Sequence, residues 1–440
     1  MEENLQKTEF KESLGEVNTP YKLADQMISL FPEDFLMNPK NTWLDPGCGS
    51  GNISWRLFNR LIQYHNPKHI LEEMLHMVEI NKEREMDVRS VFKSYSDRLI
   101  LSITDFLNWT PEKEIDAIIC NPPYNFNGVI KTPTNNNIEK KDDGANAWCQ
   151  FVQHSLNIVK QGGYMCFIVP AIWLKPDDKA GMYNLLTSYN ILKLHCFSAS
   201  ETNKLFKGLG QTPTTIFFLK KEKPTIQRFS LYCQKEERYF NFDYSLKPPI
   251  PMCNIVLINK MLYRIKESGY IKVTKTNMPP KHVEFSPFET DKFKFKNIKT
   301  VIQVKGDISK GENIFDSMEG TMKGEKIITW SNSPCIGYGH PKIILAHKMY
   351  GLPFLDLLGE YGVSNRDNYI ISGTDYSLEE LERIYSLLCC PIILDIYDST
   401  RYRMRYLEKY AFRFIPDITK ITELNSKEIN NKSIKKYFDI

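Results

Sequence analysis

A glycine-rich turn between a short apolar run and an amphipathic segment constrains the fold of this chain more than any other feature. Asn41 to Leu44 is the apolar run, the turn from Asp45 to Asn52 reads Asp-Pro-Gly-Cys-Gly-Ser-Gly-Asn, and Ile53 to Tyr64 has helical spacing. Glycines let a backbone approach a ligand closely, and the amides at a helix start face that ligand. The turn therefore predicts a nucleotide-type cofactor site. Its spacing is neither the dinucleotide fingerprint nor that of a phosphate-binding loop.

The first half of the chain continues this alternation of strand-like and helical segments. Trp148 to Val159 is amphipathic at helical spacing, Gln161 to Gly163 is expected to form a turn, and Lys131 to Asp143 is expected to form a polar, mobile loop. The further strands are expected at Leu75–Ile80, Leu99–Ile103, Ile115–Cys120, Tyr164–Val169 and Thr214–Leu219. Such an order predicts an α/β fold with a parallel, doubly wound sheet.

The length of 440 residues predicts more than one domain. The pattern changes around Lys220 to Pro224, so we expect a first domain of residues 1–222 and a second, mixed α+β domain of residues 223–440. Residues 1–220 carry 23 basic and 26 acidic side chains, and residues 221–440 carry 34 and 27. A polyanionic partner is therefore expected to bind the second half.

Several classes of protein are disfavoured by the composition. No apolar run approaches the ~18 residues that a membrane span needs, and the polar start from Met1 to Phe10 does not resemble a signal peptide. The ten cysteines are irregularly spaced without a Cys-x-x-Cys pair, so neither a metal site nor a disulfide framework is expected. Reduced thiols indicate a cytoplasmic protein. The lack of a long apolar run predicts that it has no membrane partner.

Carboxylates follow at the ends of the next two expected strands. Glu79 ends the second strand, where an acid can accept hydrogen bonds from both hydroxyls of a ribose. Asp105 and Phe106 follow the third strand, where a carboxylate could bind an adenine amino group while the phenyl ring lies against the base. Acids at successive strand ends beside one glycine-rich turn favour a nucleoside-containing cofactor.

The fourth expected strand runs into the most specific motif, Asn121-Pro122-Pro123-Tyr124. Two prolines fix the backbone and remove donors, so the Pro122 carbonyl can point outward beside the Asn121 amide. An aryl amine is a poor nucleophile because its lone pair is delocalised into the ring. Two oxygens that accept its N–H bonds localise that lone pair, and Tyr124 can stack on the base. The motif therefore predicts attack by an aryl or amide nitrogen, helped by positioning and electrostatics.

The order of these motifs resembles the gamma-class amino-methyltransferases, in particular the adenine-specific enzymes of restriction–modification systems. That pattern begins with a Thr-Pro segment, here Thr19-Pro20, and ends with a helix and a Gly-Gly strand, here Trp148 to Pro170. The resemblance covers roughly residues 15–220. It implies a Rossmann-like domain that transfers a methyl group from S-adenosylmethionine to N6 of a flipped-out adenine in DNA.

The resemblance also assigns roles to residues. Thr19 would contact the methionine end of the cofactor, Asp45 and the glycine backbone its amino-acid part, Glu79 the ribose, and Asp105 with Phe106 the adenine. The implied cofactor-binding residues are Thr19, Asp45, Gly47, Cys48, Gly49, Gly51, Asn52, Glu79, Asp105 and Phe106, and the implied catalytic residues are Asn121, Pro122, Pro123 and Tyr124. Tyr124 and Phe206 would stack on the target base. One departure is the 34 positions from Asp45 to Glu79, which indicate an insertion at residues 60–73.

The second half is expected to be a domain that recognises the target sequence in double-stranded DNA, because flipping a base requires a grip on the duplex. Its basic–aromatic clusters suit phosphate contact and stacking, although a solvated lysine face is the ordinary interpretation of any one of them. The candidate residues are Lys292, Lys294 and Lys296, expected on one strand face, and Arg401, Arg403 and Arg405. The end of the domain, from Leu378 to Pro416, resembles specificity domains of the same family.

Other functions remain open at this point. Methylation of an adenine in RNA is one alternative. The same tetrapeptide also occurs in enzymes that methylate a protein glutamine. N4-cytosine methylation usually goes with Ser before Pro-Pro-Tyr. A non-catalytic binding module is a further alternative, which the complete motif set disfavours. A separately encoded restriction endonuclease is a conceivable partner. The chain is expected to be a monomer in the cytoplasm of a bacterial cell or a virus-infected host.

Overall fold

The computed structural model describes residues 18–125, 146–176, 181–210, 212–234, 236–300, 327–347, 353–364, 366, 368–403 and 407–440. The described residues up to Lys247 form one compact unit, and nearly all of those from Pro248 onward form a second. In the described residues, no helix has both the length and the apolar composition needed to cross a membrane. The expected loop from Lys131 to Asp143 lies outside the described residues.

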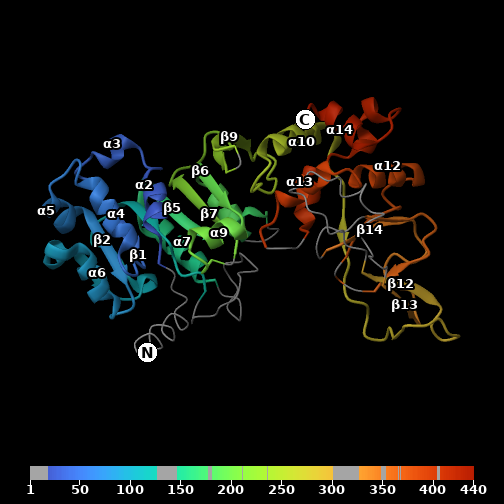
Figure 1. Cartoon of the computed structure of the whole chain (residues 1–440), viewed down its shortest axis with the longest axis horizontal. Coiled ribbons are helices and arrows are strands. Elements are labelled where there is room, and N and C mark those ends of the chain that lie inside the picture. Colours follow the sequence, from blue (N-terminus) through green and yellow to red (C-terminus); the bar gives the residue numbers. More distant parts are fainter. Residues whose placement is uncertain are drawn as a thin grey trace. The chain divides into compact units, whose positions relative to one another are not determined.

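The first unit is built on a twisted sheet whose strand order is β3-β2-β1-β4-β5-β7-β6-β8-β9 (Figure 1). Neighbouring strands are parallel from β3 to β5. The bounds of these five strands are Trp43–Pro46 for β1, Leu75–Glu79 for β2, Ile100–Ile103 for β3, Ile115–Cys120 for β4 and Val159–Pro170 for β5. Each of these strands overlaps an expected strand. The local pattern of apolar residues was therefore sufficient to locate them.

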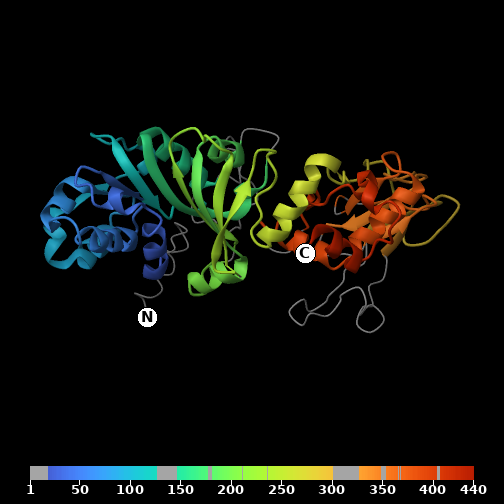
Figure 2. The ribbon, with the colours of Figure 1, turned by 90° about the horizontal axis from the view of Figure 1, so that it is seen from above.

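The expectation of a parallel sheet is wrong beyond β5. Strand β7 (Thr214–Lys220) runs antiparallel to both of its neighbours, β5 and β6 (Asn190–Phe197). The chain passes outward to β6 first and then returns to fill the position between β5 and β6, which reverses its direction. The sheet is therefore mixed, and it appears as one continuous layer in the view from above (Figure 2).

Helices α2 (Tyr21–Ile28) and α4 (Asn52–Leu61) pack against each other and against the sheet. Their buried side chains, among them Met27 and Phe58, belong to the same core cluster as Trp43 of β1. The other helices of this unit are α3 (Glu33–Leu36), α5 (Pro67–His69), α6 (Arg84–Phe92), α7 (Ala147–Ile158), α8 (Met182–Thr187) and α9 (Ala199–Leu205). The predicted insertion at residues 60–73 holds the end of α4, helix α5 and most of the π-helical turn Ile70–Met74.

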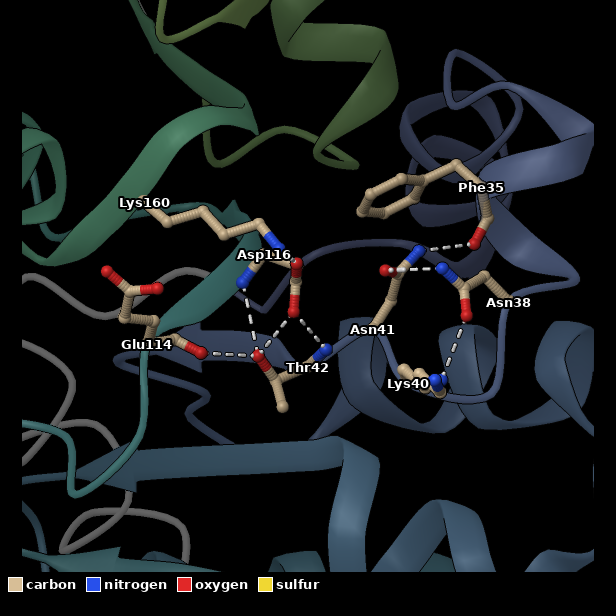
Figure 3. A network of polar contacts seen from close by, with 8 residues as sticks. All are labelled: Phe35, Asn38, Lys40, Asn41, Thr42, Glu114, Asp116 and Lys160. Atoms are coloured by element: carbon tan, nitrogen blue, oxygen red, sulfur yellow. Dashed lines mark hydrogen bonds and ion pairs between the residues drawn. The ribbon is translucent and has the colours of Figure 1, made fainter.

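A buried carboxylate joins the amino ends of β1 and β4 (Figure 3). Oδ2 of Asp116 accepts hydrogen bonds from the amide and the hydroxyl of Thr42, both at 2.9 Å, and Oδ1 forms an ion pair with Lys160. Beside this network, Nδ2 of Asn41 donates to the carbonyl oxygen of Phe35 at 2.8 Å. Because β1 and β4 are parallel, holding their amino ends together also aligns their carboxyl ends, where the site is formed.

The first unit extends further along the chain than the expected boundary at residues 222 and 223. Strand β8 (Arg228–Cys233) pairs in parallel with β6, and β9 (Arg238–Asp243) pairs antiparallel with β8. Their inward side chains, such as Leu231 and Phe242, are fully buried. The division between units therefore falls at Lys247 and Pro248, because this hairpin adds two strands to the first sheet.

The expected turn at Gln161 to Gly163 is instead an irregularity inside β5. The pairing of β5 with β4 shifts register there, from Ile115 opposite Val159 to Ala117 opposite Tyr164. Gly162 adopts φ +81°, and a Cβ atom on Gly163 would lie 2.7 Å from the Asp116 carbonyl oxygen. The two glycines thus permit a bulge where other residues would be strained or would clash.

The second unit has the expected mixed α+β composition. Its strands form two four-stranded sheets, ordered β10-β17-β14-β15 and β11-β13-β12-β16. The strand bounds are Thr274–Lys275 (β10), Phe285–Ser286 (β11), Phe295–Thr300 (β12), Ile327–Ser331 (β13), Lys342–Ala346 (β14), Phe354–Asp356 (β15), Gly362–Val363 (β16) and Asn368–Ser372 (β17). The helices are α10 (Ile255–Ser268), α12 (Leu378–Leu388), α13 (Ile392–Asp398) and α14 (Asn431–Phe438). A small core that includes Ile298, Ile344 and Ile370 joins the two sheets.

Candidate active site

A cavity of about 340 Å³ lies in the first unit at the carboxyl ends of β1, β2 and β4. It gathers nearly all of the cofactor and catalytic residues expected from the sequence, although they come from segments far apart in the chain. Those on its wall are Thr19, Gly47, Cys48, Gly49, Asn52, Glu79, Asp105, Phe106, Asn121, Pro122, Pro123, Tyr124 and Phe206. Asp45 and Gly51 are not among the residues that line the cavity.

The glycine turn depends on its backbone conformation. Gly47, Gly49 and Gly51 all have positive φ, from +54° to +80°, which other residues adopt only with strain. A Cβ atom on Gly47 would lie 3.2 Å from the ring of Phe151, so a side chain there would narrow the cavity. Gly51 is the N-cap of α4 and packs against Val88, and it therefore shapes the turn rather than lining the cavity.

Asp45 is a buried carboxyl group beneath the turn, only 1% exposed. Its Oδ2 accepts a hydrogen bond from the hydroxyl of Ser54 at 2.6 Å, and its Oδ1 has no partner in the described part of the chain. Burial raises the pKa of Asp45 to about 7, the Ser54 hydrogen bond opposes this rise, and the charge of Glu79 adds to it. A buried oxygen without a donor costs about 1–3 kcal/mol, so Asp45 is well suited to accept a hydrogen bond or a positive charge from a ligand.

Glu79 is oriented by two backbone amides. Oε2 accepts from the amide of Gly49 at 2.8 Å, and Oε1 accepts from the amide of Asn81 at 2.8 Å. The first of these bonds joins the acid at the end of β2 to the glycine turn after β1. The carboxylate is thereby held in the cavity wall, where it is suited to accept hydrogen bonds from ribose hydroxyls.

Asp105 and Phe106 follow β3 and also lie on the wall, but both are engaged locally. Asp105 caps a short 3₁₀ helix (Phe106–Asn108), accepting from the Leu107 amide at 3.0 Å. The Phe106 ring is almost fully buried and packs against Phe151, with centroids 5.0 Å apart. Phe151, on α7, is a cavity residue that the sequence analysis missed, because an apolar residue at helical spacing has the pattern of an ordinary core residue.

The Asn121–Tyr124 tetrapeptide follows β4 directly and lines the cavity beside the turn, since a Cβ atom on Gly47 would lie 3.9 Å from Cδ of Pro123. Nδ2 of Asn121 donates a hydrogen bond to Oγ1 of Thr19 at 3.0 Å. The hydroxyl of Tyr124 is buried and has no partner among the described residues, and burial raises its pKa. The four residues are thus brought to the same cavity as Glu79 and the glycine turn.

Phe206 ends α9 and contributes to both the core and the cavity. Its side chain is 5% exposed, belongs to the main core cluster and lines the wall. The nearby Leu209 also lines the cavity, and its side chain is 57% exposed. Phe206 and Leu209 therefore supply apolar side chains to the wall of the cavity, and only Phe206 was named as a candidate from the sequence.

The expected lysine row in the second unit is only partly formed. Strand β12 begins at Phe295, so Lys292 and Lys294 precede it and only Lys296 lies within it. The ammonium group of Lys296 lies 4.8 Å from the ring centroid of Tyr361, and that of Lys292 pairs with Glu284 at 2.5 Å. Lys294 is exposed. The three lysines therefore do not form one exposed face, because β12 is shorter than the alternating pattern suggests.

The arginine cluster expected in the second half of the chain is described in part, and Arg403 is grouped with the first unit. Arg401 pairs with Asp398 at 2.7 Å, and Arg403 is half-buried. Arg405 lies outside the described residues. No group of His, Cys, Asp and Glu side chains that could hold a metal ion occurs in the described ranges.

Several known proteins are similar to parts of this chain. Residues 37–203 match the model of the Eco57I restriction-modification methylase family. A Type II methyltransferase from Thermus thermophilus is 33% identical over 98 residues, which are 20% of this chain and 22% of that protein. A tRNA1(Val) (adenine(37)-N6)-methyltransferase from Vibrio cholerae is 32% identical over 91 residues, 20% of this chain and 34% of that protein. The matches thus span 22% and 34% of the length of these relatives.

A solved structure extends the likeness in fold. The Type IIL restriction-modification enzyme MmeI in complex with DNA superposes with a TM-score of 0.51 and 11% identity, over 92% of this chain and 68% of that one. At this identity the likeness shows the fold, and it supports the expected Rossmann-like α/β domain followed by a further domain. Over residues 37–203 the chain is similar to the Eco57I restriction-modification methylases. This similarity confirms the resemblance that its motifs predicted and the expected cofactor, S-adenosylmethionine.

Proposed function

We propose that this chain is a site-specific DNA adenine methyltransferase that transfers the methyl group of S-adenosylmethionine to the N6 amine of a flipped-out adenine. The observation that carries the proposal is that Asn121 to Tyr124 line the same cavity as Glu79 and the glycine turn. A polar group suited to an aryl amine and a site suited to a nucleoside therefore line the same cavity.

The residues of the cavity and the buried Asp45 at the start of the glycine turn fit the cofactor. Gly47 leaves space that a Cβ atom would fill, Glu79 is held ready for ribose hydroxyls, and Oδ1 of Asp45 is a buried acceptor without a donor among the described residues. When bound, S-adenosylmethionine supplies a methyl carbon on a positively charged sulfur. Thr19, Asn52, Asp105 and Phe106 complete the wall that would hold it.

The chain's own residues would then act on the acceptor base. Oδ1 of Asn121 and the carbonyl oxygen of Pro122 would accept the two N–H bonds of the adenine amine, drawing its lone pair out of the ring. The rings of Tyr124 and Phe206, both on the cavity wall, would stack on the base and hold it flat. Positioning of this kind contributes to rate without a strong base, and no strong base is needed because the amine loses its proton only after methylation.

The second unit would supply the grip on the duplex that base flipping requires. Its fold is included in the likeness to the restriction-modification enzyme whose structure contains DNA. Exposed cations such as Lys294 are candidates for phosphate contacts, and Arg401, Arg403 and Arg405 are further candidates from the sequence. The proposed partner is thus double-stranded DNA, bound by a monomer in the cytoplasm. A separately encoded endonuclease for the same site would be consistent with this function.

The test is transfer of tritium from methyl-labelled cofactor to duplex DNA of mixed sequence, followed by digestion to nucleosides. We expect N6-methyladenine from the wild type and a loss of at least about 100-fold in Asn121→Ala, the scale of removing one transition-state hydrogen-bond partner. Asn59→Ala is the matched control, because Asn59 lies on α4 and its side chain donates to the Trp55 carbonyl outside this cavity. Label in cytosine instead of adenine would show that the proposed acceptor base is wrong.

An adenine in RNA is the second candidate acceptor. The relatives from Vibrio cholerae and Aliivibrio fischeri are named as tRNA adenine-N6 methyltransferases, and each is about as similar over the shared segment as the Type II enzyme is. Unmodified tRNA is therefore included in the same assay. Labelling of tRNA without labelling of DNA would overturn the DNA assignment while leaving the adenine chemistry intact.

A further inference from the structure

Thr19 is held between the catalytic amide and the glycine turn by two hydrogen bonds. Nδ2 of Asn121 donates to Oγ1 of Thr19 at 3.0 Å, and Nδ2 of Asn52 donates to the carbonyl oxygen of Thr19 at 2.8 Å. One residue earlier, Oδ1 of Asn18 accepts from the hydroxyl of Ser50 at 3.0 Å. Thr19 is 6% exposed and lines the cavity. The segment from Asn18 to Thr19 therefore connects the turn after β1 to the end of β4.

The orientation of the Asn121 side chain matters for the chemistry. An asparagine amide has one end that accepts hydrogen bonds and one end that donates them, and a half-turn about χ2 exchanges the two. Only Oδ1 can accept an N–H bond of the acceptor amine, whereas Nδ2 would direct its own hydrogens at that amine. Because the amide is planar, holding Nδ2 on the Thr19 side leaves Oδ1 on the opposite side.

We infer that Thr19 is a positioning residue for methyl transfer, because its hydroxyl oxygen holds Nδ2 of Asn121 and so keeps Oδ1 directed at the acceptor amine. This role rests on the proposed function and differs from the cofactor contact that the sequence resemblance implies for Thr19. The bond from Asn52 fixes the Thr19 backbone, so the hydroxyl stays in place when the acceptor enters. Thr19 thereby couples the cofactor side of the cavity to the acceptor side.

Two substitutions at Thr19 separate the hydroxyl from the shape of the side chain. Thr19→Val keeps the shape and removes the acceptor, and Thr19→Ser keeps the hydroxyl. Each is placed in the wild-type chain and in Asn121→Asp, whose carboxylate has two equivalent oxygens and therefore needs no orientation. The rate of a single turnover is measured on duplex DNA with saturating S-adenosylmethionine, and the dissociation constant of S-adenosylmethionine is measured separately.

The expected result is a non-additive pattern. Thr19→Val should slow the wild-type reaction about 10- to 100-fold at saturating cofactor, the scale of a small misplacement of a catalytic group. The single-turnover rate of Thr19→Ser should stay within about 3-fold of the wild-type rate. In the Asn121→Asp background, Thr19→Val should slow the reaction less than about 3-fold, because a carboxylate does not need Thr19 to orient it.

Equal slowing by Thr19→Val in both backgrounds would overturn the inference. So would a defect that disappears when the cofactor concentration is raised, since Thr19 would then serve cofactor binding alone. If Asn121→Asp is too slow to time, the effect of Thr19→Val on kcat is compared with its effect on the KM for S-adenosylmethionine. A lower kcat supports the positioning role, and a change in KM alone contradicts it. Failure of the wild type to methylate DNA counts against the proposed function instead, and the Thr19 variants are then compared on whichever acceptor the wild type methylates.

Discussion

Acidification is expected to destabilise the first unit through His195, a buried histidine in β6 with 4% exposure. Its Nδ1 lies 2.9 Å from Nε2 of Gln26, and its Nε2 lies 2.6 Å from the hydroxyl of Tyr239. An amide nitrogen can only donate, so Nδ1 must accept and the ring must be neutral. Protonation would place a second N–H against the Gln26 donor, beside the nearby charge of Lys193.

Burial is the main cause that lowers the pKa of His195 from 6.5 to about 4, and Lys193 adds to it. A histidine with a lowered pKa in the folded state stabilises the fold above its unfolded pKa, and this stability is lost as the pH falls. The window therefore runs from about pH 6.5 down to about pH 4. A shift of this size corresponds to about 3 kcal/mol of unfolding free energy.

Urea unfolding at about pH 7 and about pH 4.5, followed by tryptophan fluorescence, measures this loss. Five of the six tryptophans lie in residues 1–247, so the signal reports mainly on the first unit. His195→Gln cannot gain the proton and serves as the control for all other groups that titrate. Between the two pH values, the wild type should lose about 2–3 kcal/mol more than the variant. Equal losses would refute the argument that His195 must remain neutral.

Three further outcomes are expected. Gly47→Ala should fold but bind S-adenosylmethionine at least about 10-fold more weakly, because φ is +72° and the new methyl group would lie 3.2 Å from Phe151. Calorimetry measures the affinity, and an unchanged value would contradict the close packing at this position. Lys342→Met should destabilise the second unit by about 3–5 kcal/mol, because it leaves the buried Asp356 carboxylate without its cation, and hydrogen exchange of β14 would report this loss. Lys294→Ala should weaken DNA binding and reduce the slope of affinity against salt by about 1 if this exposed lysine contacts a phosphate.

The candidate site was largely predictable because its residues follow strands directly. Glu79 ends β2, Asp105 comes two residues after β3, and Asn121 follows β4. The carboxyl ends of parallel strands meet at one edge of a sheet, so residues at those positions come together whatever the loops between them do. The apolar runs locate the strands, and a motif that directly follows a strand is therefore placed at the carboxyl edge of the sheet.

Other features depended on pairing between distant segments. The sequence did not indicate that β7 inserts antiparallel between β5 and β6, or that β8 and β9 join the same sheet, because an apolar run has the same pattern whichever neighbour it pairs with. Phe151 likewise looks like a core residue until α7 is packed over the glycine turn.

The sequence by itself determined which groups are available for the proposed chemistry, namely a glycine turn, two strand-end acids and the Asn121–Tyr124 tetrapeptide. Only the tertiary structure decided how those groups are oriented. The Glu79 carboxylate is held by the amide of Gly49, and the Asn121 amide is held by the hydroxyl of Thr19. It also decided which cations are engaged, since Lys296 lies over Tyr361. The physical reason is that residue type fixes what a side chain can donate or accept, whereas its direction depends on partners that lie far away in the chain.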